Sequence, residues 1–446
     1  MRTQRRKPSI DVAIVGAGAA GLSAARDLHS AGYSVLLLEA RNRVGGRVFT
    51  IRPQRSVLPI ELGAEFVHGR AEEVTQIAKA ADLPVLEIEG LRIDTSGAKL
   101  RRLEDFWEQL DAVMRRLPDR READQSFADF LKRHPGGRTL ARNRRLARGF
   151  VEGFHAADVE RISAVSLHEA GSPGEDQREQ RLGRMIDGYD RVIDRLATPV
   201  RGRIRTGSPI TSIDWRDSRF IQLTTSSGSR LRARAVIVTV PIGVLQASMA
   251  NTGPLRFDPP LEAKRSALTG LAIGCVTRIV LLFREAVWAE ERFASRVGLP
   301  TDLLTFIHGE STDFPVWWTA YPRRIPLITG WCGGPRAATL SGLAPAELTR
   351  RAVRSLAVQL RVSAARLERL LLEGWSHDWN RDPYARGAYT YQLIGGTDAV
   401  SALARPIGGR LFFAGEATDT EGATGTVHGA IASGRRAARQ VKRVFN

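Results

Sequence analysis

Residues 11–50 read DVAIVGAGAAGLSAARDLHSAGYSVLLLEARNRVGGRVFT. The apolar run at 11–15 predicts a strand buried on both faces, because apolar and polar residues do not alternate in it. Residues 19–31 predict a helix, and residues 34–38 predict a second buried strand. This order of strand, glycine turn, helix and strand favours an α/β fold with a parallel, Rossmann-like sheet.

The first turn contains three glycines, Gly16, Gly18 and Gly21, at the spacing of the dinucleotide-binding fingerprint. The first permits a tight turn, the second lets backbone approach a diphosphate, and the third lets the helix pack on the strand. The start of the helix, which includes Ala20, presents free N–H groups that favour a diphosphate. Glu39 follows the second strand, where a carboxylate binds ribose hydroxyls and repels a 2′-phosphate, so NADP is not expected. The alternative is a Gly-rich turn with a purely structural role.

A second glycine pair follows in the run ARNRVGGR, residues 40–47. Glycines flanked by arginines suit another close approach of backbone to a diphosphate, whereas the alternative is a solvated basic loop. This extended form resembles the FAD-binding signature of the flavin amine oxidase family. It adds five predicted cofactor contacts: Ala40, Arg41, Gly45, Gly46 and Arg47.

Later motifs also resemble the flavin-containing amine oxidase family, which includes monoamine oxidases, polyamine oxidases and flavin-dependent histone lysine demethylases. They are ELGAEFVHG (61–69), VIVTVPIGVLQ (236–246), FDPPL (257–261), WNRDPYARGAYTY (379–391) and FAGEAT…TGTVHGAIASGRRAA (413–438).

The pattern along the chain indicates two domains. We expect a Rossmann-like FAD-binding domain assembled from residues 1–69, 186–254 and 405–446. Two insertions, residues 70–185 and 255–404, would form an α+β substrate domain, and the first of them is expected to be mainly helical.

The resemblance implies further cofactor contacts. Glu416 follows a strand end where a carboxylate can meet ribityl or diphosphate-side hydroxyls, although it can also cap a helix. Thr426 and Val427 open a helix whose N-terminus would face the flavin and stabilise negative charge on it. The other implied contacts are Gly63, Ala64, Glu65, Phe66, Ile210, Trp379 and Gly415.

The resemblance also places substrate chemistry at Tyr389. In the family an aromatic residue here forms one wall of a cage that guides the amine to the flavin, and the alternative is a core tyrosine. A second tyrosine of monoamine oxidases falls at Thr426, which leaves half a cage. Ala388 stands where monoamine oxidases have the cysteine that links to the flavin, so we expect FAD to be bound non-covalently.

Two more residues are catalytic candidates. Arg278 occupies the position of a lysine that reaches the flavin through a water in the family, and arginine stays charged at any working pH. Arg278 could substitute for it, the acceptor could differ from oxygen, or oxidase activity could be weak; a misaligned strand with a surface arginine is the other interpretation. His68 is either beside the substrate or a helix-end or core histidine. Trp317 and Trp318 are channel or core residues.

Composition restricts the remaining possibilities. Six of the 66 basic residues are lysines, which leaves 60 arginines, and the net charge is +18. The arginines are scattered, so nucleic-acid binding is not expected. No apolar run approaches the ~18 residues of a membrane span, and no signal peptide is recognised. Two cysteines fit a reducing compartment, and we expect a cytoplasmic protein. No residue cluster has metal-ligand spacing, and the sequence indicates no oligomeric state.

We therefore expect an FAD-dependent enzyme whose partners are a small amine and O2. Hydride would pass from the α-carbon of a primary or secondary amine, a class that includes polyamines, to flavin N5. The imine would hydrolyse, and oxygen would be reduced to hydrogen peroxide. The alternatives are an L-amino-acid oxidase, which needs a cationic clamp for a carboxylate, and a flavin-bearing binding protein with weak or no oxidase activity.

Overall fold

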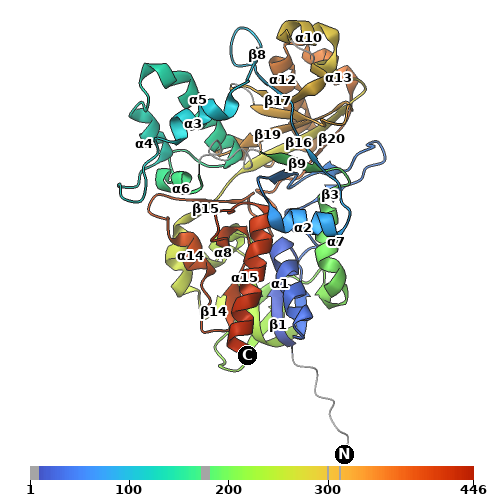
Figure 1. Ribbon diagram of the computed structural model, residues 1–446. Helices are drawn as coiled ribbons and strands as arrows, with labels where there is room; N and C mark the ends of the chain where they lie inside the picture. The colour runs from blue at the N-terminus through green and yellow to red at the C-terminus, as the bar shows by residue number, and fades with distance from the viewer. Residues whose placement is uncertain (1–9, 172–180, 299–300, 311–312, 446) are drawn as a thin grey trace, which may run out of the picture.

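The computed structural model describes residues 10–171, 181–298, 301–310 and 313–445. Two large sheets organise it, one in the lower half and one in the upper half of Figure 1. The first sheet has eight strands, β10 (Ile204–Arg205), β2 (Val35–Leu38), β1 (Ile10–Val15), β13 (Arg230–Val238), β12 (Ile221–Thr225), β11 (Ile210–Asp214), β14 (Arg256–Asp258) and β22 (Leu411–Phe413).

The centre of this sheet is parallel and brings together distant parts of the chain. Strand β13 pairs with β1 on one side, Val236 opposite Ala13, and with β22 on the other, Val236 opposite Leu411. Strand β2 pairs with β1 in parallel, as the sequence pattern predicts. The carboxyl ends of strands from three separate regions of sequence therefore lie side by side. Parallel α/β sheets bind ligands at these ends of their strands.

Both faces of β1 are buried, which explains its uninterrupted apolar run. Val12 and Ile14 belong to the core formed with α1 (Ala19–Ser30), α7 (Asp190–Ala197) and α15 (Val427–Phe445). Ala13 and Val15 belong to the core formed with α8 (Ile242–Met249), α9 (Arg265–Thr269) and α14 (Ala399–Ala404). Helices α1 and α15 lie side by side in Figure 1.

The second sheet is mostly antiparallel. Its strands are β20 (Leu371–Ser376), β16 (Val276–Phe283), β19 (Leu327–Gly333), β18 (Val316–Thr319), β17 (Leu304–His308), β7 (Leu91–Asp94) and β8 (Arg101–Arg102). The core on one face of this sheet includes residues of α10 (Glu291–Val297), α11 (Pro335–Ala338), α12 (Pro345–Leu360) and α13 (Ala364–Leu370).

The stretch 70–185 is mainly helical, as its sequence indicates, but it also contains short strands. It contains α2 (Glu72–Ala80), α3 (Phe106–Met114), α4 (Phe127–Lys132), α5 (Ala141–Phe154) and α6 (Ala164–Glu169). It also supplies β6 (Val85–Glu87), β7, β8 and β9 (Leu182–Met185). The prediction missed these strands because they are short and their partners are distant, as in the pairing of β7 with β17.

Among the described residues, three small sheets accompany the two large ones. Strand β5 (Phe66–His68) pairs with β9, β3 (Thr50–Ile51) with β4 (Ile60–Glu61), and β15 (Leu271–Ile273) with β21 (Thr390–Gln392). In the part of the chain that the structure describes, no helix is both long and apolar enough to cross a bilayer.

Candidate active site

One cavity of about 1580 Å³ is lined by residues of both large sheets. This exceeds the roughly 300–1000 Å³ of a pocket for one small ligand, so a cofactor and a substrate fit together. Its inner end lies at the glycine turns, and its outer end lies among β7, β17, α3 and α5. All the sequence-predicted site residues line this cavity except Gly21.

The glycine turn after β1 has distinct roles for its glycines. A Cβ atom on Gly21 would lie 2.1 Å from the carbonyl oxygen of Gly16, so Gly21 permits contact between helix and strand, as predicted. Gly16 has a φ of +107°, which favours glycine. Gly18 faces the cavity, where a Cβ would meet only the Gly45 carbonyl at 4.0 Å. The backbone is therefore open to a ligand at Gly18.

The N-terminus of α1 is suited to an anion. Among the residues that the structure describes, no side chain caps this helix, and its first turn contains no acidic residue. Its free N–H groups lie beside Ala19 and Ala20, which line the cavity. Glycine turns and an open helix end together fit a dinucleotide diphosphate.

Glu39 lies at the end of β2 and is 3% exposed. Its carboxylate accepts hydrogen bonds from the backbone N–H of Ala17 at 2.7 Å and of Arg41 at 2.9 Å. Arg41 donates to Asp382 at 2.6 Å, and Asp382 also contacts His377 at 2.9 Å. A carboxylate has four lone pairs, so Glu39 can still accept from ribose hydroxyls.

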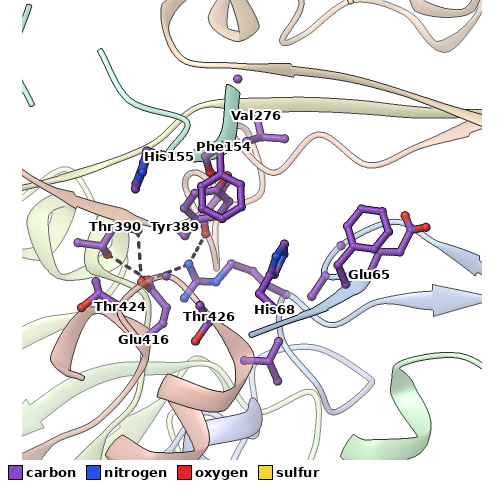
Figure 2. A pocket seen from close by; sticks show the side chains of 18 of the residues that line it. Glu65, His68, Phe154, His155, Val276, Tyr389, Thr390, Glu416, Thr424 and Thr426 are labelled. Atoms are coloured by element: carbon purple, nitrogen blue, oxygen red, sulfur yellow. Dashed lines mark hydrogen bonds and ion pairs between the residues drawn. The ribbon is translucent and has the colours of Figure 1, made fainter. Parts of the chain in front are cut away.

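Glu416 ties three segments together beside the cavity. It accepts from Thr390 N–H at 3.2 Å, from Thr390 Oγ1 at 3.1 Å and from Arg47 Nη1 at 3.0 Å, and the bonds to Thr390 are visible in Figure 2. Arg47 also donates to the carbonyl of Ala388. Because Glu416 is buried and lies before α15, its carboxylate acts as a cross-link in addition to any cofactor contact.

Tyr389 lies directly above the start of α15. A Cβ atom on Gly425 would lie 3.5 Å from Tyr389 Cδ2, and Figure 2 places Thr426 below the tyrosine. The Tyr389 hydroxyl donates to the carbonyl oxygen of Phe154 at 2.5 Å. The Thr426 hydroxyl accepts from Gly429 N–H at 3.0 Å and so caps α15. Burial, and then the charge of Glu416, raises the pKa of Tyr389, which keeps the phenol neutral.

Arg278 is buried, so the interpretation as a surface arginine is wrong. Its side chain on β16 is 4% exposed. It donates to the Gly63 carbonyl at 2.9 Å and forms an ion pair with Glu65. Glu65 also contacts Arg184 at 2.9 Å and accepts from Trp318 Nε1 at 3.0 Å. Burial opposes ionisation of Glu65, but Arg278 and Arg184 outweigh it and lower the pKa of the carboxyl.

His68 belongs to the cavity wall. It lies on β5 and makes edge contacts with Phe66, 6.0 Å between ring centroids, and with Phe154 at 5.4 Å. Burial, and then the neighbouring His428, lowers the pKa of His68 to about 4. The imidazole is therefore neutral at neutral pH and can exchange hydrogen bonds with a ligand.

The candidate tryptophans differ in whether they face the cavity or the protein core. Trp379 donates its indole N–H to the Leu62 carbonyl at 2.8 Å, and its ring edge would meet a Cβ on Gly63 at 3.2 Å. Trp317 is fully buried in the core of the second sheet, whereas Trp318 lines the cavity.

Sequence reasoning missed the outer part of the cavity. It is lined by Arg92, Phe106, Arg145, Arg148, Phe150, Phe154, Phe306 and His308. The α3 and α5 phenylalanines look like ordinary core positions, and the arginines do not stand out among sixty. Only the alternation of short strands could have indicated which of these side chains face inward.

Comparisons with known proteins agree with this geometry. A family profile described as "Flavin containing amine oxidoreductase" matches residues 19–442. Polyamine oxidase 2 of Arabidopsis thaliana is 28% identical over 99% of this chain and 89% of its own length. Lysine-specific histone demethylase 2 of Homo sapiens is 27% identical over 96% of this chain and 53% of its own length.

Solved structures share the fold. Putrescine oxidase bound to putrescine matches with a TM-score of 0.79 at 22% identity, over 98% of this chain and 99% of that one. Cyclohexylamine oxidase from Brevibacterium oxydans IH-35A has a TM-score of 0.79 at 20% identity, over 98% of this chain and 100% of that one. The profile match includes α1, Tyr389 and the start of α15. The chain is a member of the flavin-containing amine oxidoreductase family, whose enzymes oxidise amines with a flavin.

Proposed function

We propose that the protein binds FAD non-covalently and oxidises a small amine at the carbon next to nitrogen, with O2 as the final acceptor. The observation that carries this proposal is the convergence of the first glycine turn, the start of α15 and Tyr389 on one cavity. When bound, FAD supplies the hydride acceptor, and the products are an imine, which hydrolyses, and hydrogen peroxide.

The inner end of the cavity would hold the cofactor. The diphosphate would contact backbone at Gly18, Ala20 and Gly46, and the adenosine ribose would meet Glu39. The other predicted contacts surround the same space, with Ile210 at the end of β11. Ala388 offers no sulfur for a covalent bond, which supports non-covalent binding.

The chain's own residues would prepare the amine at the other end of this space. The Tyr389 ring would form one wall against the substrate, and the small Thr426 opposite leaves room for a substituted amine. The apolar surroundings favour the neutral amine, which is the form that can be oxidised. Neutral His68 would orient the substrate by a hydrogen bond.

Arg278 would provide a fixed positive charge beside the cofactor. Glu65 and the Gly63 carbonyl hold its guanidinium, and the second arginine on Glu65 leaves this cluster with a surplus positive charge. A permanent cation stabilises negative charge that develops nearby, which is the electrostatic part of what a lysine would do there.

The test begins with the purified yellow protein under anaerobic conditions. Mixing it with mono-, di- and polyamines should bleach the flavin absorbance, and admitting oxygen should restore the colour and release peroxide. Acid precipitation should leave a white pellet and a yellow supernatant. A colourless protein that takes up no added FAD would overturn the proposal. If FAD is bound but no amine bleaches it, amine oxidation would be overturned and FAD binding would stand.

A further inference from the structure

Arg92 stands in the outer part of the cavity, within a cluster of aromatic rings. It lies on β7, and its guanidinium carbon is 4.4 Å from the ring centroid of Phe306, 4.9 Å from Phe106 and 5.5 Å from Trp107. All four residues line the cavity. The guanidinium is therefore surrounded by rings and borders open space.

No acidic group neutralises Arg92. In the described ranges its side chain has neither an ion pair nor a hydrogen bond, and only burial lowers its pKa, to about 10. Asp94, which shares its strand, is occupied by Arg142 at 3.1 Å and by the N–H of Ser96 at 2.9 Å. The pKa of His308, beside Phe306, falls to about 3 through burial and then through the charge of Arg92.

Arg148 and Arg145, which also line the cavity, differ from Arg92 in this respect. Arg148 contacts Glu152 at 3.1 Å, and Arg145 lies 3.8 Å from Glu310. Their charges are matched by the protein, whereas the charge of Arg92 is left for a ligand. A desolvated guanidinium beside open space is best satisfied by an anion that accepts two parallel hydrogen bonds.

Two rows of rings connect Arg92 with the inner end of the cavity. One row runs from Phe66 to Phe306, 6.0 Å between centroids. The other runs from Phe154 to Phe150 at 4.8 Å and on to Phe106 at 6.5 Å. His68 contacts the first ring of both rows, and Tyr389 is hydrogen-bonded to Phe154. Both rows end beside Arg92. They enclose an apolar stretch of the cavity between the reactive end at Tyr389 and the cationic end at Arg92.

We propose that Arg92 binds a carboxylate at the far end of the substrate, so that the enzyme acts on amines whose opposite terminus is anionic. This rests on the proposed function, which places the amine at Tyr389. A diamine of the same length would bring its second ammonium group against Arg92 and would be disfavoured. An α-amino acid carries its carboxylate on the carbon that reacts. With that carbon at Tyr389, the carboxylate would not reach Arg92.

The test compares ligands of equal length and different ends. The probes are 6-aminohexanoate, hexylamine and 1,6-diaminohexane, with homologues from four to eight carbons, in anaerobic flavin reduction by the holoenzyme. Binding of hexanoate, which has no amine, is measured separately by calorimetry. We expect the amino acid of optimal length to exceed the diamine in kcat/KM by about 10- to 100-fold, the range for one hydrogen bond to a charged group.

Substitutions then assign the effect to Arg92. Arg92→Gln should weaken hexanoate binding and lower kcat/KM for the amino acid by about 10- to 100-fold, while hexylamine changes less than about threefold. Arg92→Lys should retain part of the preference. Arg216→Gln removes an exposed arginine outside the cavity and should change neither. If Arg92→Gln does not fold, the ligand series on the wild-type protein still decides.

The outcomes distinguish the two proposals. Flavin reduction by all three amines with no preference for the carboxylate would overturn the role of Arg92 and leave amine oxidation intact. Hexanoate binding that depends on Arg92, without flavin reduction by any amine, would support the subsite and overturn the proposed activity. A preference for the diamine, or hexanoate binding equal in Arg92→Gln and wild type, would also overturn the subsite.

Discussion

The inner and outer ends of the cavity differ in how their charges are matched. At the inner end Glu39, Glu65 and Glu416 each receive hydrogen bonds or ion pairs from the protein itself. At the outer end Arg92 has rings around it and, in the described ranges, no ion pair with an acidic side chain. The comparison indicates that the inner end is built to hold its shape, whereas the outer end is built to select a ligand. Substitutions at the inner end should therefore affect stability first, and substitutions toward the outer end should affect substrate use first.

The largest effect is expected at Gly21. In Gly21→Ala the new Cβ would lie 2.1 Å from the Gly16 carbonyl, and neither helix nor strand can move without disturbing the sheet. We expect loss of bound flavin and of about 3 kcal/mol of stability, the upper end of the usual cost of overpacking, measured by flavin content and chemical unfolding. Gly202→Ala, where a Cβ meets nothing within 4 Å, is the control and should behave as wild type. Full flavin content in Gly21→Ala would refute the packing role.

The next largest effect is expected at Glu65. Glu65→Gln leaves Arg278 and Arg184 buried without their shared carboxylate, which should cost about 3–5 kcal/mol in the free energy of unfolding. Glu104→Gln breaks an exposed pair with Arg102 at 2.9 Å and should cost less than about 1 kcal/mol. If the two variants unfold at the same denaturant concentration, the Glu65 cluster contributes nothing to the rigidity of the inner end.

Glu61 provides a test by pH. Burial raises its pKa from 4.5 to about 7, so the folded state holds the proton more tightly than the unfolded chain. Its contribution to stability is complete below pH 4.5 and is lost as pH rises through 7. The wild type should lose up to about 3 kcal/mol relative to Glu61→Gln between pH 4.5 and pH 7. Exposed Glu285→Gln should follow the wild-type curve. Parallel curves for wild type and Glu61→Gln would contradict the buried, protonated carboxyl.

Tyr389, at the boundary of the two ends, should show the smallest effect. Tyr389→Ala removes the ring and should lower kcat/KM for amines by about 3- to 30-fold. Tyr389→Phe keeps the ring and loses only the hydrogen bond to Phe154, so it should retain most of the activity. Equal losses in both variants would assign the role to the hydroxyl instead of the ring. Steady-state peroxide release measures turnover, and the midpoint of thermal unfolding measures stability, so the two effects can be distinguished.

Local sequence was sufficient for the glycine turn after β1 and for Glu39. The spacing of Gly16, Gly18 and Gly21 and the acid at 39 lie within one strand, helix and strand, so their geometry follows from neighbouring residues. Arg92 could not be found in this way. Its position depends on the pairing of β7 with β17, where Leu91 lies opposite Leu304, and no local pattern indicates that contact. Arg184 was missed for the same reason, since Glu65 is far from it in sequence.

The position of β22 has a consequence for biogenesis. This strand completes the parallel centre of the first sheet, and α15 follows it to the end of the described chain. A ribosome-bound chain that lacks these last elements has the first glycine turn but neither Glu416 nor the helix start at Thr426. Cofactor capture is thus expected only after β22 and the start of α15 have been synthesised and have joined the sheet.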